Sequence, residues 1–173
     1  MEEKIKSDLF QYLLSLGKID ERLPECPDLE EKWQNIAEAY LPDGIREFNN
    51  YPISSLGWMM FIGMAMAKYW DEDWEKYASD TNIYEQIRNQ RGYDEIDEYV
   101  LKDLLHLKGK DDEAMRSLVG ECASRTYSLL HHAHLEPGTA EAFKGFISSL
   151  HQLYLMGVAI QLKCMGYRMT LID

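Results

Sequence analysis

Apolar residues recur at helical spacing along nearly the whole of this 173-residue chain, and this feature most constrains its fold. The strict alternation of polar and apolar residues that marks a half-buried strand is almost absent. Such a chain can bury its apolar stripes only by packing helix against helix. We therefore expect an all-α fold, an irregular antiparallel bundle of six or seven helices.

Turn and capping residues divide the chain into segments. The first expected helix carries Ile5, Leu9, Leu13 and Leu16 on one face and ends at Gly17. Caps, glycines and prolines predict six further helices, at about 28–41, 54–78, 82–91, 94–108, 111–136 and 139–166. Residues 167–173 could form a short extended tail.

The second helix is expected to begin with a capping box and to end at a proline. Asp28 and Glu31 have the spacing of the box, and Pro42 lacks the N–H that a helix interior needs. The irregular stretch that follows, to Pro52, is too short for a linker between domains. We therefore expect residues 1–173 to form a single helical domain, which can bury about 70% of its unfolded surface.

Charge excludes several classes of partner. The chain has 18 Lys and Arg against 30 Asp and Glu, a net charge of −12. All of this excess lies in residues 1–112, whereas residues 113–173 have five basic and five acidic side chains and four of the five histidines. Phosphate backbones and anionic lipids would be repelled, so we expect neither nucleic-acid nor membrane binding. A basic protein partner would suit the acidic surface.

Compartment signals favour the cytoplasm. The start, Met1-Glu2-Glu3-Lys4, lacks the layout of a signal peptide, and the longest nearly unbroken apolar run, 56–67, is too short to span a membrane. The cysteines are three in number, far apart and without a C-x-x-C pair, which is typical of a reducing environment.

Three histidines, His131, His132 and His134, are close together in the sixth expected helix. Neutral imidazole is a common metal ligand, so His131 and His134 are candidate ligands if another helix or subunit completes the site. On a helical wheel, however, the three point in different directions, and no Glu-x-x-His or H-E-x-x-H motif is present. Solvated helix-end histidines or a pH-sensitive interface are the alternatives, and we otherwise expect no cofactor.

The third expected helix has a carboxylate inside its apolar arc. Asp73 falls between the directions of Tyr69 and Tyr77, close to Trp70. If Asp73 is buried in an aromatic pocket, these four residues could bind a cationic or hydroxylated ligand. Alternatively, Asp73 lies at a frayed helix end or pairs with an arginine.

The last expected helix is apolar nearly all round between residues 153 and 162. Tyr154, Gly157 and Gln161 lie on its apolar arc, which would face either the interior of the monomer or a homodimer interface. The neutral C-terminal third favours a dimer. Small residues at 63–65 and 157–159 predict close helix–helix contacts.

Motifs for nucleophilic catalysis and phosphate binding are absent from the sequence. The favoured hypothesis is a non-catalytic module that binds a protein partner or a small ligand. The alternative is a metal-dependent or acid/base enzyme with an aromatic-lined cleft, using residues among Asp73, Tyr69, His131, His134 and His151.

Overall fold

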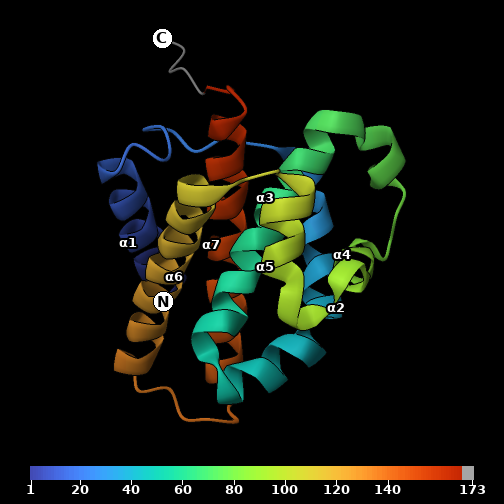
Figure 1. The fold of residues 1–173 in the computed structure, drawn as a ribbon. Coiled ribbons are helices and arrows are strands. Elements are labelled where there is room, and N and C mark those ends of the chain that lie inside the picture. The colour runs from blue at the N-terminus through green and yellow to red at the C-terminus, as the bar shows by residue number, and fades with distance from the viewer. Residues whose placement is uncertain (169–173) are drawn as a thin grey trace.

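The computed structural model describes residues 1–168 and confirms the all-α expectation (Figure 1). The α-helices are α1 (Glu2–Ser15), α2 (Pro27–Asn50), α3 (Pro52–Ala78), α4 (Ile83–Arg91), α5 (Ile96–Glu98), α6 (Gly109–His132) and α7 (Ala140–Cys164). A 3-10 turn, η1 (Tyr93–Glu95), precedes α5, and a π-helical segment, η2 (Tyr99–Leu104), follows it. No strand occurs between residues 1 and 168. Most of the expected extended tail lies outside the described residues.

Helices α3 and α7 form the centre of the bundle and share its most extensive contact. Their backbones approach closely at Gly63 and Gly157. A Cβ atom added at Gly63 would lie 2.3 Å from the carbonyl oxygen of Tyr154, and one at Gly157 would lie 2.2 Å from that of Met60. The prediction that small residues mark close helix–helix contacts is thereby confirmed.

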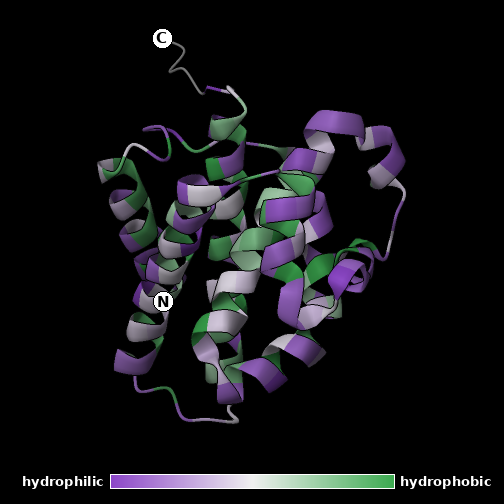
Figure 2. Cartoon of the chain, in the orientation of Figure 1, coloured by the Kyte–Doolittle hydropathy of each residue, from purple (hydrophilic) through white to green (hydrophobic). Residues whose placement is uncertain are grey.

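The remaining helices surround this pair. Helices α1 and α6 lie on one side, and α2, α4 and α5 on the other (Figure 1). The predicted stripe of α1 is buried at Ile5, Leu9 and Leu13, but Leu16 follows the end of the helix and is 48% exposed. Along the ribbon, hydrophobic residues dominate the middle of α3 and α7, and hydrophilic residues dominate the end of α3 (Figure 2).

Helix α2 differs from its prediction at both ends. Its N-cap is Cys26, and Asp28 accepts a hydrogen bond from the Trp70 indole instead of forming a capping box. Pro42 lies inside the helix, which continues to Asn50. The lost helical hydrogen bond faces solvent, because Pro42 and Glu38 are both exposed.

Tertiary contacts hold the part of α2 that follows Pro42. Asp43 is 8% exposed and accepts hydrogen bonds from the Tyr84 hydroxyl at 2.6 Å and from Arg88 at 3.1 Å, both on α4. The Ser55 hydroxyl donates to the Gly44 carbonyl oxygen at 2.7 Å. These buried polar contacts stabilise a helical conformation that proline disfavours locally.

The last three expected helices are found with shifted or broken bounds. The segment expected as one helix over 94–108 is divided into η1, α5 and η2, and α6 begins at Gly109. The predicted cap of α7 is confirmed, since Thr139 Oγ1 accepts from the Ala142 N–H at 3.2 Å. Within residues 1–168, no helix combines the length and apolar character that crossing a bilayer requires.

Candidate functional site

Asp73 is exposed, so the alternative in which it is buried in an aromatic pocket does not describe its position. The backbone leaves the helical conformation at Asp73 (φ −162°, ψ 80°) and resumes it at the next residue. Asp73 Oδ1 accepts a long hydrogen bond, 3.4 Å, from the Lys76 N–H three residues later. This is the geometry of an N-cap, so Asp73 begins a new helical segment at a kink in α3.

The kink brings two of the predicted ligand-binding residues together. The rings of Tyr69 and Tyr77 stack with centroids 4.1 Å apart and 15° between their planes. The Tyr69 hydroxyl lies 2.6 Å from that of Tyr99 on η2. Burial, followed by this hydrogen bond, raises the pKa of Tyr69 well above the ordinary tyrosine value. Trp70 is oriented elsewhere, toward Asp28 and the ring of Tyr167.

Among residues 1–168, no third ligand lies beside the candidate metal pair. His131 and His134 are both exposed, and His134 follows the end of α6 with a positive φ of 52°. Within residues 1–168, no three His, Cys, Asp or Glu side chains gather closely enough to hold a metal ion. His131 instead borders an apolar cavity at the base of the bundle.

The residues predicted for a dimer interface belong to the interior. Tyr154 is fully buried and donates a hydrogen bond of 2.9 Å to the Leu29 carbonyl oxygen. Gly157 contacts the backbone of α3, and Gln161 is 7% exposed. Because all three are covered within the monomer, the interior alternative describes their position, and an interface on these residues does not.

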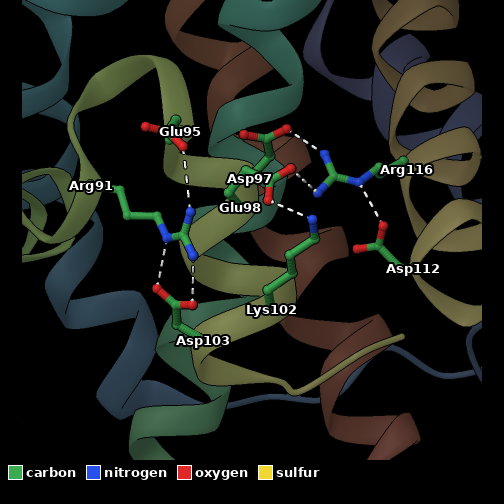
Figure 3. Close-up of polar contacts among 8 residues, drawn as sticks. All are labelled: Arg91, Glu95, Asp97, Glu98, Lys102, Asp103, Asp112 and Arg116. Atoms are coloured by element: carbon green, nitrogen blue, oxygen red, sulfur yellow. Dashed lines mark hydrogen bonds and ion pairs between the residues drawn. The ribbon is translucent and has the colours of Figure 1, made fainter. Parts of the chain in front are cut away.

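A cluster of charged side chains surrounds Arg116 (Figure 3). Its guanidinium contacts three carboxylates, those of Asp97, Glu98 at 2.8 Å and Asp112 at 3.0 Å. Asp97 and Asp112 each keep one buried oxygen without a hydrogen-bond partner. The cluster ties α6 to α5, which places it beside the π-helical segment. Its carboxylates are already engaged by a cation of the chain itself.

A more enclosed candidate is a pocket of about 310 Å³ between α1, α2 and α7. Six apolar residues of its lining come from the 16–26 connection, α2 and α7, and we call them its wall: Leu23, Pro24, Pro27, Leu29, Leu155 and Val158. The other four lining residues, which we call its rim, have polar or ionisable side chains: Lys6, Glu25, Cys26 and Glu30. An apolar wall with a few polar groups at its edge is typical of small-molecule sites. We call it the α1–α2–α7 pocket.

His151 contacts Glu30 of this pocket and joins three helices. Its Nδ1 is 3.2 Å from Glu2 Oε1 on α1, and its Nε2 is 3.3 Å from Glu30 Oε2 on α2. The ring stacks on Trp33 with centroids 4.9 Å apart. Through these two contacts the imidazole links α7 to the first turns of α1 and α2.

The pKa values of Glu2 and Cys26 are shifted in opposite directions from their ordinary values. Burial raises the pKa of Glu2, but hydrogen bonds from Gln152 and His151 outweigh burial and leave the pKa lowered. At Cys26, burial raises the thiol pKa despite hydrogen bonds from the N–H groups of Leu29 and Asp28. Cys26 is therefore a neutral thiol at pH 7 and a poor nucleophile.

The sequence indicates His151 as a candidate residue but does not indicate which carboxylates lie beside it. The carboxylates on either side lie 149 and 121 residues away in the chain, and neither forms a short motif with the histidine. From the sequence alone, the proline and leucine residues of the pocket wall are indistinguishable from those of an ordinary loop and an ordinary core. Comparisons with family models, with curated proteins and with solved structures found no match to this chain.

Proposed function

We propose that this protein is a non-catalytic binding module whose α1–α2–α7 pocket receives a small amphipathic ligand. The observation that carries the proposal is the pocket itself, with six apolar wall residues and a polar rim around about 310 Å³. This volume is at the lower end of the range of small-molecule pockets, so a short aliphatic or single-ring body would fit.

The state of the rim favours binding over catalysis. Glu30 is engaged by His151 at 3.3 Å, and Glu25 lies 3.9 Å from Arg22. The Cys26 thiol is neutral because burial raises its pKa. These groups can orient a bound molecule by hydrogen bonds and charge, but they lack an activated nucleophile with a free base beside it.

Charge favours a ligand with a positive head. Glu25 and Glu30 outnumber Lys6 at the rim, and the whole chain carries −12. Such a field raises the local concentration of small cations and lowers that of anions. An amine attached to a short apolar body is therefore the class of ligand that this pocket suits best.

Ligand-observed NMR with hexylamine, hexanol and hexanoate tests the proposal, because the three probes share a body and differ in head charge. We expect hexylamine to bind most tightly and hexanoate least. Leu155→Trp, which fills the pocket from a half-buried position, should weaken hexylamine binding at least about ten-fold. Leu129→Trp is the matched control, a half-buried leucine on α6 away from the pocket. Binding that is equal in both variants would rule out this pocket as the site.

A further inference from the structure

The base of the bundle contains a second, more apolar cavity. The end of α2, the start of α3, the 133–139 connection and the first turn of α7 meet there (Figure 1). The cavity has a volume of about 220 Å³. Rings and leucines form most of its wall: Phe48, Tyr127, Leu130, His131, Leu135 and Phe146. The Phe48 ring lies 5.0 Å from that of Phe146 and 6.0 Å from that of Tyr127, which holds α2, α6 and α7 together around the opening.

Four large exposed apolar side chains lie on the elements that meet at this end of the bundle. Ile45, Tyr51, Ile53 and Phe143 are 42%, 65%, 36% and 48% exposed, and they are four of the seven such side chains within residues 1–168. Ile45 precedes Phe48 by one helical turn, and Phe143 precedes Phe146 by one turn, so each adjoins the cavity wall. We call these four residues with the cavity the basal patch. Large exposed apolar patches on a protein surface often mark interaction sites.

We propose that the basal patch is a two-fold homodimer interface in which Phe143 of each copy enters the cavity of the other. Phe143 projects beside the cavity on the same helix turn that supplies Ala142 to its wall. A surface that has a projecting ring next to a cavity can be self-complementary, because a two-fold axis places each ring opposite the other copy's cavity. An isologous interface requires such self-complementarity. The cavity is also large enough, because about 150 Å³ of apolar space accepts a benzene ring.

The charge distribution supports a second copy as the occupant. Two chains that each carry a net charge of −12 repel each other, and the entire excess of negative charge lies in residues 1–112. Residues 113–173, which supply most of the cavity wall, have five basic and five acidic side chains. Two copies therefore meet with least repulsion through the end of α6 and the start of α7. The proposal does not depend on the α1–α2–α7 pocket, which lies between other parts of the helices.

Sedimentation equilibrium on the whole chain tests the projecting ring. We expect the unchanged protein to be dimeric and Phe143→Ser to raise the dimer Kd at least about ten-fold, because buried aromatic anchors dominate interface energies. Leu16→Ser is the matched control, since Leu16 is also 48% exposed but lies at the far end of α1. A monomer at about 100 µM, or equal Kd values for both variants, would overturn the proposal.

A second pair of variants tests the cavity without altering Phe143. Ala142→Leu narrows the cavity from a half-buried position, whereas Ala140→Leu places the same side chain at an exposed position on the same helix. We expect only Ala142→Leu to weaken the dimer. Thermal unfolding of every variant establishes that each one is folded. A dimer that withstands Phe143→Ser and Ala142→Leu alike forms through another surface.

Discussion

At the scale of single residues, two glycines allow the central helices to touch. Gly63 and Gly157 face the partner helix's carbonyl groups, and even a methyl group at either position would overlap a backbone oxygen. Backbone atoms cannot rotate away as a flexible side chain can, so the helices themselves would have to move apart. These two positions therefore determine how closely α3 and α7 pack.

We expect Gly157→Ala to lower the free energy of unfolding by about 2 to 3 kcal/mol, because overpacking forces the two helices apart. Gly120→Ala is the control, since Gly120 lies within α6 and an added Cβ meets nothing within 4 Å. The free energy of unfolding of that variant should rise by about 0.4 to 1 kcal/mol, because alanine reduces the conformational freedom of the unfolded chain. Urea unfolding of both variants measures the difference. Equal effects would mean that the α3–α7 contact tolerates a methyl group.

At the scale of elements, α3 is two helical segments joined at Asp73. The kink lets the ring of Tyr77 return onto that of Tyr69, and all the charged side chains of this helix lie between Lys68 and Lys76, on either side of the kink. A polar residue that falls on an apolar face of a helical wheel is misplaced only if the helix is continuous. Here the helix restarts, and the carboxylate serves as its cap.

We expect Asp73→Ala to lower the free energy of unfolding by about 0.5 to 1 kcal/mol, as the loss of an N-cap does. Asp73→Asn retains a side-chain oxygen that accepts the same hydrogen bond. Its free energy of unfolding should therefore lie within a few tenths of a kcal/mol of that of the original protein. Guanidinium unfolding followed by far-ultraviolet circular dichroism compares the two. If Asp73→Asn lowers the free energy of unfolding as much as Asp73→Ala does, the charge of Asp73 matters more than its hydrogen bond.

At the scale of the whole molecule, polar contacts attach α1 to the rest of the bundle. Glu2 Oε1 accepts from Gln152 at 3.1 Å and lies 3.2 Å from His151, both on α7. Near the middle of α1, Arg125 of α6 contacts Asp8 at 3.3 Å and lies over the Tyr12 ring. The start of the chain is thus held at one side of the α1–α2–α7 pocket.

The lowered pKa of Glu2 makes this attachment sensitive to acid. A carboxyl whose pKa is lower in the folded state stabilises the fold above its ordinary value, near 4.5, and loses that contribution as the pH falls through the folded value. We expect Glu2→Gln to lower Tm by about 1 to 3 °C at pH 6 and to have no effect near pH 3. Differential scanning calorimetry measures both.

Glu3→Gln provides the control for charge alone, because Glu3 is the exposed neighbour on the same turn of α1. It should leave Tm nearly unchanged at both pH values. A Tm difference between Glu2→Gln and the original that persists unchanged at pH 3 would show that the contact does not depend on the Glu2 charge.

The sequence by itself determined the helical class, the order of most helices and several of their ends. Apolar spacing, the Gly17 stop and the Thr139 cap act within a turn or two, so they can be recognised from neighbouring residues alone. Only the tertiary structure decided that α2 continues past Pro42, because the buried Asp43 contacts come from α4. It likewise decided which residues surround His151 and that Tyr154 faces the interior. Such contacts join residues more than a hundred positions apart, and no local pattern encodes them.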